Sequence, residues 1–168
     1  MYPIDMKTIC IYGDNRHETF TKTRIACRGI VLQDGKLLLS REERVDWWLI
    51  PGGGLEEGED CVSCCVREVE EETGYRVRPI REFLVMEEYY EEWRYVSHYF
   101  ICEITGEGRQ ALTEQEKKRG LVPKRLPLSD ALLIFAKHQD FAGISEEKRG
   151  SYLREYTALC TYMEDCAE

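Results

Sequence analysis

The order of apolar and polar residues along the chain predicts strands interleaved with helices. Short runs that are rich in β-branched and aromatic residues, and that are bounded by Gly, Pro or Asp, are typical of strands. We expect strands in residues 8–13, 23–33, 36–42, 47–54, 77–90, 92–105 and 121–128. The pair Asp34-Gly35 is a strong hairpin signal between two of these segments, and a second turn is expected near Glu91-Glu92.

Three further segments carry the spacing or the end signals of helices. They are residues 59–73, 129–139 and 145–166. Gly74 follows the first of them directly, in the position where a left-handed residue commonly ends a helix. In the last segment, apolar residues recur at three- and four-residue steps and predict one buried stripe. This stripe consists of Leu153, Tyr156, Cys160 and Met163.

Alternating strands and helices predict an α/β fold, with helices packed around a mixed sheet. A chain of 168 residues suits one domain with a substantial core, so we treat residues 1–168 as a single domain. Within it, residues 1–23 form an N-terminal extension and residues 138–168 a C-terminal helical extension. Residues 106–120 are expected to be a polar loop. The pattern does not determine the strand order.

Charge and composition exclude several classes of function. The net charge of −9 argues against binding long nucleic acid, because release of counterions requires clustered Lys and Arg. No run of eighteen apolar residues predicts a membrane span, and the first residues do not resemble a secretory signal, so we expect a cytoplasmic protein. In a reducing compartment, the eight cysteines are expected to serve as small buried apolar residues rather than as metal ligands.

The segment 52–75, GGGLEEGEDCVSCCVREVEEETGY, concentrates eight carboxylates in a chain that is already acidic. On a helix, Glu68, Glu71 and Glu72 share one narrow sector. A neighbouring sector is apolar and is expected to pack on the sheet; it holds Val62, Cys65, Val66 and Val69. A solvated acidic face is one interpretation. The other is a cation site, since clustered carboxylates are hard oxygen ligands suited to Mg²⁺ or Mn²⁺.

The residues on either side of this acidic sector support a cation site. Glycines in PGGG allow the backbone to approach a ligand closely, and the carbonyl of Gly52 is a candidate additional metal ligand. Arg67 lies beside Glu68 in the sequence and is expected to orient the neighbouring carboxylates.

The spacing of the specified residues matches a known motif at every position. The matching residues are Gly53, Glu59, Arg67, Glu68, Val69, Glu71, Glu72, Gly74 and Tyr75. They follow the Nudix box: Gly, five residues, Glu, seven residues, Arg-Glu, an apolar residue, any residue, Glu-Glu, any residue, Gly and an apolar residue. The chain therefore resembles the Nudix hydrolase family of MutT-like proteins, over about residues 24–105.

The resemblance implies a Nudix-type α/β/α sandwich with a central mixed β-sheet and a Nudix helix. It also implies hydrolysis of the pyrophosphate linkage in a nucleoside diphosphate that is joined to another group. By this resemblance, the carboxylates of Glu68, Glu71 and Glu72 ligate Mg²⁺ or Mn²⁺. Gly53 and Glu59 shape the loop and the helix, and Gly74 allows the turn into the next strand.

Residues outside the box supply further candidates. In this family the general base lies either in the box or outside it, and the segment LTEQE offers Glu114 and Glu116, of which we favour Glu116. Arg41 and Arg28 are candidates for binding phosphate, although each also fits a plain surface charge. His98 alternates with apolar neighbours on a strand and is expected to be structural.

The box reports only the shared diphosphate, so three substrate classes stay open. They are a nucleoside triphosphate, a nucleotide sugar such as ADP-ribose, and a dinucleoside polyphosphate. Aromatic residues are candidates for stacking on the base, and they are Trp47, Trp48, Tyr89, Tyr90, Trp93 and Tyr95. The alternative function is a non-catalytic domain that senses a nucleotide. A homodimer through the C-terminal helix is also open.

Overall fold

The computed structural model describes residues 6–166. The first five residues of the expected N-terminal extension and the last two of the C-terminal extension lie outside the described residues. The strands are β1 (Lys7–Tyr12), β2 (Lys22–Gln33), β3 (Lys36–Glu42), β4 (Trp47–Leu49), β5 (Gly52–Gly54), β6 (Tyr75–Tyr90), β7 (Trp93–Glu107) and β8 (Leu121–Pro127). The helices are α1 (Cys61–Thr73), α2 (Glu114–Arg119), α3 (Leu128–Phe135), the 3-10 helix η1 (Ala136–Phe141) and α4 (Glu146–Cys166).

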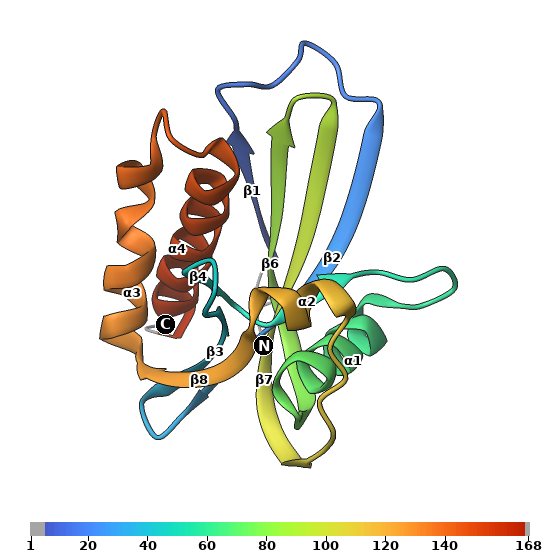
Figure 1. Ribbon diagram of the computed structural model, residues 1–168. Helices are drawn as coiled ribbons and strands as arrows, with labels where there is room; N and C mark the ends of the chain where they lie inside the picture. The colour runs from blue at the N-terminus through green and yellow to red at the C-terminus, as the bar shows by residue number, and fades with distance from the viewer. Residues whose placement is uncertain (1–5, 167–168) are drawn as a thin grey trace.

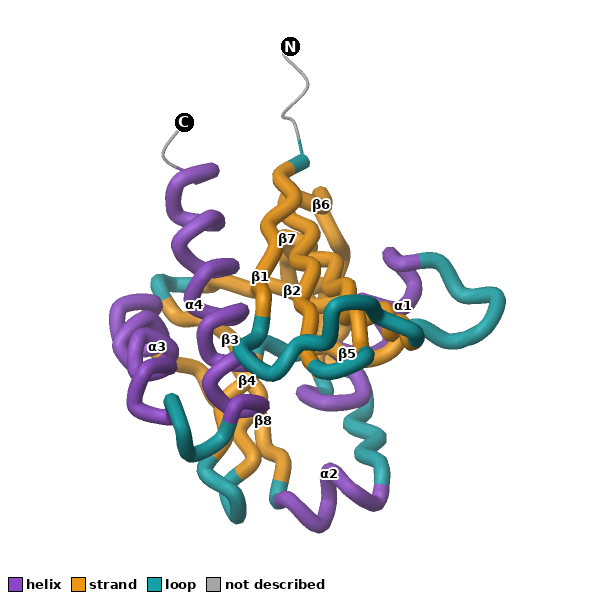
Figure 2. The backbone as a smooth tube through the Cα atoms, turned by 90° about the horizontal axis from the view of Figure 1, so that it is seen from above, coloured by secondary structure: helices purple, strands orange, loops and turns teal. Residues whose placement is uncertain are grey.

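The strands form one mixed sheet in the order β1-β6-β7-β2-β3-β4, with β5 paired to β2 and β8 paired to β3. The pairs β1–β6 and β2–β7 are parallel, and the other pairs are antiparallel. Helix α1 lies on one side of the strands and α3 and α4 lie on the other (Figures 1 and 2). The predicted α/β/α sandwich is confirmed.

Both faces of the sheet are buried, because helices cover both. Ile30 and Val31 are adjacent on β2 and point to opposite faces, yet neither is more than 2% exposed. The face under α3 and α4 carries the larger apolar cluster, which includes Ile30, Leu84 and Leu159. The face under α1 carries a smaller cluster that includes Val31 and Val69.

The two predicted hairpins are confirmed. Asp34 and Gly35 have φ values of 53° and 72°, the left-handed conformation at both central positions that matches the twist of the flanking strands. The second hairpin joins β6 and β7 through Glu91 and Glu92, and Glu91 has a φ of 50°.

Helix α1 begins two residues later than predicted. Asp60 is its N-cap, and its side chain accepts a hydrogen bond from the backbone N–H of Ser63. The left-handed ending at Gly74 is confirmed, with a φ of 77°. Val62 was predicted on the buried side and is 50% exposed, so that part of the prediction is wrong. Cys64 is fully buried in its place, in the same apolar cluster as Cys27 and Val69.

Residues 106–120 are not only a loop. Thr113 and Glu116 form a reciprocal capping box that begins α2, and this signal is present in the sequence as a Thr followed three residues later by a Glu. The expected strand 47–54 is divided at Pro51 into β4 and β5, which pair with different neighbours.

The apolar stripe predicted on α4 is buried only in part: Leu153 and Tyr156 are half-buried and pack against the core. Met163 is 40% exposed, whereas Tyr152, Glu155 and Leu159 are buried. The fully buried face lies beside the predicted stripe and includes a polar residue, Glu155, which apolar spacing alone does not report. Within residues 6–166, no helix has both the length and the apolarity needed to cross a membrane.

Candidate active site

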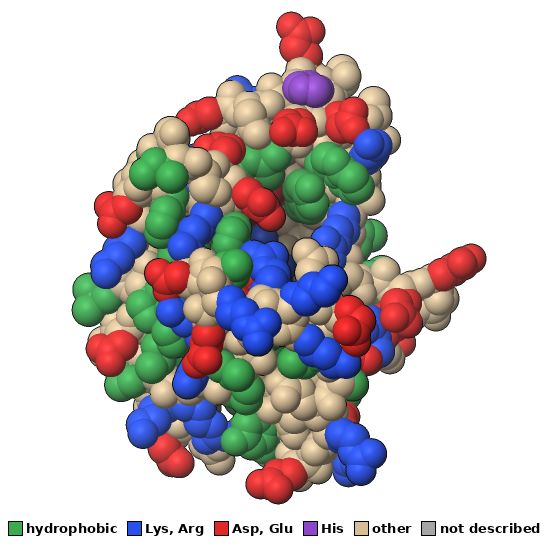
Figure 3. Space-filling model, viewed as in Figure 1, with side chains coloured by type: hydrophobic (Ala, Val, Ile, Leu, Met, Phe, Trp, Pro, Cys, Tyr) green, Lys and Arg blue, Asp and Glu red, His purple; other side chains and the backbone are tan. Residues whose placement is uncertain are grey.

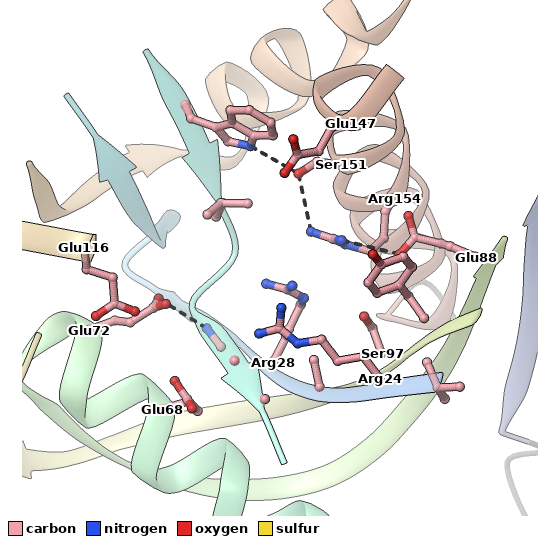
Figure 4. Close-up of a pocket in the computed structure, with 18 of the residues that line it drawn as sticks. Arg24, Arg28, Glu68, Glu72, Glu88, Ser97, Glu116, Glu147, Ser151 and Arg154 are labelled. Carbon is pink, nitrogen blue, oxygen red and sulfur yellow. Dashed lines mark hydrogen bonds and ion pairs between the residues drawn. The ribbon is translucent and has the colours of Figure 1, made fainter. Parts of the chain in front are cut away.

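A cleft of about 790 Å³ opens between helices α1, α2 and α4 and strands β2, β5, β6 and β7. Lys and Arg side chains gather over α2 in the middle of the same face, beside a hollow (Figure 3). The carboxylates of Glu68, Glu72 and Glu116 lie at one end of the cleft, Arg24 and Arg28 lie in its middle, and Arg154 lies at the α4 end (Figure 4).

The glycine segment of β5 forms the wall between Arg28 and α1. A methyl group at Gly52 would collide with the backbone oxygen of Cys27 and with the stem of Arg28. At Gly53 it would collide with the carboxylate of Glu68. These positions require glycine because the backbone touches a side chain or another strand; the approach expected from the sequence was to a ligand, and it stays a prediction.

Glu72 is the most buried carboxylate of the box. It accepts hydrogen bonds from the hydroxyl of Ser40 at 2.6 Å and from the backbone N–H of Gly52 at 3.3 Å. The pKa of Glu72 is raised to about 8, mainly by burial and also by the negative charges of Glu116 and Glu68, against the opposing effects of Ser40 and Arg28.

Arg67 holds the other acidic residues of the box together. Its Nε lies 2.8 Å from Glu59 Oε1, and one terminal nitrogen lies 2.7 Å from Glu68 Oε1 and 3.1 Å from Glu71 Oε2. Its other terminal nitrogen donates to the carbonyl of Gly54 at 3.0 Å. Burial raises the pKa of Glu68, whereas the contact with Arg67 lowers it.

The donor set fits a hard divalent cation. Across residues 6–166, no three His, Cys, Asp or Glu side chains already surround one point as a cation site would, and Arg67 contacts Glu68 and Glu71 instead. The negative charge of Glu116 nevertheless raises the pKa of both Glu68 and Glu72, so these three carboxylates repel one another. A divalent cation between them would offset this repulsion, and carboxylate oxygens are the ligands that Mg²⁺ and Mn²⁺ prefer.

Helix α2 brings Glu116 to the cleft. Glu116 Oε2 accepts the backbone N–H of Thr113 at 2.8 Å, which fixes the carboxylate. The helix is attached to the neighbouring strand by the ion pair of Arg119 with Glu42, at 2.9 Å. The other candidate, Glu114, is 82% exposed, contacts Lys117 and does not line the cleft.

The two candidate phosphate-binding arginines have different positions. Arg28 lines the cleft. Arg41 does not: it pairs with Asp46 at 2.5 Å and lies over the ring of Trp48, so the structure does not support its expected contact with phosphate. The geometric reason is that Arg41 lies directly opposite Trp48 in the pairing of β3 with β4, so its side chain packs on that ring.

Among the three arginines labelled in Figure 4, sequence reasoning missed two, Arg24 and Arg154. Arg24, Ala26 and Arg28 alternate along β2 and all line the cleft, so the period-two pattern of a strand was sufficient to find Arg24. Arg154 has no local signal, because only the packing of α4 brings it to the cleft. Among the aromatic candidates, those that line the cleft are Trp47, Tyr90, Trp93 and Tyr95. His98 pairs with Glu82 at 2.5 Å, which is consistent with a structural role.

The NUDIX domain profile matches residues 22–144. This chain belongs to the Nudix family. A Nudix hydrolase of Nitrosomonas europaea has the same fold, with a TM-score of 0.58 and 22% identity over 81% of this chain and 89% of that chain. An ADP-ribose pyrophosphatase of Streptococcus suis aligns with a TM-score of 0.54 and 21% identity over 84% of this chain and 91% of that chain.

Sequence relatives within the Nudix family carry different names. A Bacillus subtilis protein provisionally named an ADP-ribose pyrophosphatase is 28% identical over 128 residues, which cover 67% of this chain and 62% of the relative. A second, provisionally named an 8-oxo-dGTP diphosphatase, is 34% identical over 103 residues, covering 59% and 66%. The chain thus spans just under two thirds of the length of these relatives.

Proposed function

We propose that this protein hydrolyses the pyrophosphate linkage of a nucleoside diphosphate joined to another group, with Mg²⁺ or Mn²⁺ as its cofactor. The observation that carries this proposal is the convergence of Glu68, Glu72 and Glu116 on one end of a cleft whose middle holds Arg24 and Arg28. Carboxylates beside arginines suit a substrate whose phosphates bind a cation on one side and guanidinium groups on the other.

The box carboxylates Glu68, Glu71 and Glu72 would hold the cation, with the carbonyl of Gly52 as an additional ligand. When bound, a divalent cation neutralises phosphate charge and lowers the pKa of water. The protein itself supplies position: Ser40 fixes Glu72, and Arg67 fixes Glu68 and Glu71.

Three further groups of residues would bind the phosphates, accept a proton and contact the nucleoside. Arg24 and Arg28 would bind phosphate oxygens and stabilise the charge that spreads over them during phosphoryl transfer. Glu116 would accept the proton of the attacking water, since its carboxylate faces the cleft and is fixed by Thr113. The rings of Trp93 and Tyr95, stacked at 5.5 Å, offer an apolar surface to the nucleoside.

The test is turnover of a substrate panel in the presence of Mg²⁺. The panel contains nucleoside triphosphates, oxidised nucleotides, ADP-ribose and other nucleotide sugars, and dinucleoside polyphosphates, with products resolved by chromatography. We expect cleavage of one class to a nucleoside monophosphate and a second phosphorylated product. Glu72→Gln is expected to lower turnover by about 100-fold or more, because an amide cannot replace the carboxylate that would ligate the cation.

Glu70→Gln is the matched control. Glu70 lies on the same helix, but it contacts Arg76 at 3.5 Å and does not line the cleft, so its removal should leave turnover unchanged. Full turnover in Glu72→Gln would refute the assigned roles. Binding of a nucleotide without cleavage of any panel member would instead support a sensor.

A further inference from the structure

Helix α4 lies beyond the region that the NUDIX domain profile matches, yet it forms one wall of the cleft. Its residues Glu147, Ser151 and Arg154 face the cleft in Figure 4. Behind them, Glu155 has no exposed surface at all. A carboxylate that is buried this deeply is costly unless hydrogen bonds and opposite charges compensate it.

Each oxygen of Glu155 has a defined partner. Oε2 accepts the backbone N–H of Ile50 at 2.9 Å. Oε1 accepts the hydroxyl of Tyr99 at 3.1 Å and Nε of Arg154 at 2.7 Å. The contact with Ile50 joins α4 to the chain just before the glycine segment of β5.

Arg28 binds the carbonyl group of the same residue, Ile50. One of its terminal nitrogens donates to the carbonyl of Ile50 at 3.2 Å, and its Nε lies 3.9 Å from Glu155 Oε1. Both polar groups of the Ile50 backbone are therefore bound by side chains that meet in the cleft wall. Two residues further on, the N–H of Gly52 donates to Glu72.

We propose that Glu155 is a positioning residue of the active site, which holds the segment Ile50–Gly54 and Arg28 in register with the carboxylates of α1. The proposal rests on the proposed function. Two buried carboxylates bind this segment: Glu155 of α4 accepts the N–H of Ile50, and Glu72 of α1 accepts the N–H of Gly52. Displacing it moves Arg28 relative to the phosphates and Gly53 relative to Glu68, against which it packs. Displacements of about 1 Å in such a site can cost about 100-fold in rate.

The decisive variant is Glu155→Gln. A glutamine has one acceptor oxygen and an amide that donates, so it cannot satisfy both Ile50 and Arg154. We expect kcat/KM for the cleaved substrate to fall by about tenfold or more, with a rise in KM because Arg28 loses its support. Hydrogen exchange followed by mass spectrometry should show faster exchange in the peptide that contains Ile50–Gly54.

Tyr99→Phe is the matched control. It removes another hydrogen bond to the same carboxylate but leaves the contact with Ile50 intact. It should lower stability as well, yet kcat and KM should stay within about twofold of the wild-type values and exchange in Ile50–Gly54 should not change beyond the effect of global stability. If Glu155→Gln does not fold, Glu155→Asp replaces it, since its shorter side chain keeps the charge and withdraws from Ile50.

Two results separate this proposal from the proposed function. If the wild-type protein cleaves no panel member, the proposed function fails, and exchange in Ile50–Gly54 still tests the positioning. If the wild-type protein is active and Glu155→Gln retains its kcat/KM and its exchange pattern, the positioning proposal is wrong.

Discussion

The two helical layers that cover the sheet are both apolar, but within residues 6–166 only the larger one has a buried ion pair inside it. Under α1, the sheet meets sulfur and methyl groups, and the fully buried residues there include Cys27, Cys64, Cys65 and Val69. Under α4, a fully buried carboxylate is bonded to Ile50 and Tyr99, two members of the apolar cluster. Glu155 there is surrounded by Arg154, Tyr99 and Arg28.

The difference explains how each helix is oriented. Apolar contacts are non-directional, so the α1 layer holds its helix against the sheet without fixing the direction of its carboxylates. Arg67, at the edge of the layer, fixes the direction of these carboxylates, and it is itself held by contacts with Glu59 and the carbonyl of Gly54. In the α4 layer, directional hydrogen bonds lie inside the core itself. Three variants test this contrast, and the quantity measured for each is the free energy of unfolding.

The largest loss of stability is expected for Arg154→Leu in the α4 layer. This change leaves Glu155 and Glu88 without their guanidinium partner, and breaking a buried pair costs about 3–5 kcal/mol. Urea unfolding measures the effect. Arg76→Leu is the control, because Arg76 is 63% exposed and its pair with Glu70 should contribute no more than about 1 kcal/mol. Equal losses in the two variants would contradict the contrast between the layers.

An intermediate and pH-dependent loss is expected for Glu59→Gln at the edge of the α1 layer. Hydrogen bonds from Arg67 lower the pKa of Glu59 from 4.5 to about 2. A lowered pKa stabilises the folded state above pH 4.5, and this stabilisation is lost as the pH falls toward 2. The variant should therefore lose about 1.5–3 kcal/mol at neutral pH, the range for hydrogen bonds to charged groups.

The pH series supplies the control for this second prediction. The difference between Glu59→Gln and the wild-type protein should shrink between pH 4.5 and 2. Glu57→Gln, whose side chain is exposed, should show no such convergence. A constant difference across the series would show that the loss does not come from the charge of Glu59.

The smallest loss is expected for Cys65→Ala inside the α1 layer. Its sulfur packs 3.8 Å from that of Cys102, and deleting one buried heavy atom costs about 1 kcal/mol. Turnover should not change, since Cys65 does not line the cleft.

Burial raises the pKa of Cys64 to about 11, so a thiol reagent should modify the exposed Cys10 and Cys166 before any cysteine of this layer. Rapid modification of Cys64 would contradict its role as a packing residue.

Local patterns predicted the parts of the fold that depend on neighbours in the sequence. The hairpin at Asp34-Gly35 and the left-handed end of α1 at Gly74 follow from single residues with restricted conformations. The acidic sector of α1 follows from helical spacing alone. Helix α2 was missed although its capping box is visible at Thr113 and Glu116, so that error lies in the interpretation.

The sequence by itself determined the Nudix family, because the box depends on spacing within one short segment, and the sandwich fold follows from that resemblance and from the alternation of strands and helices. Only the tertiary structure decided between Arg28 and Arg41, since the two look alike along the chain and differ in what their strands pair with. It also decided the role of α4. The contact of Glu155 with Ile50 joins residues 105 positions apart, and no periodicity in the sequence reports a hydrogen bond that only packing creates.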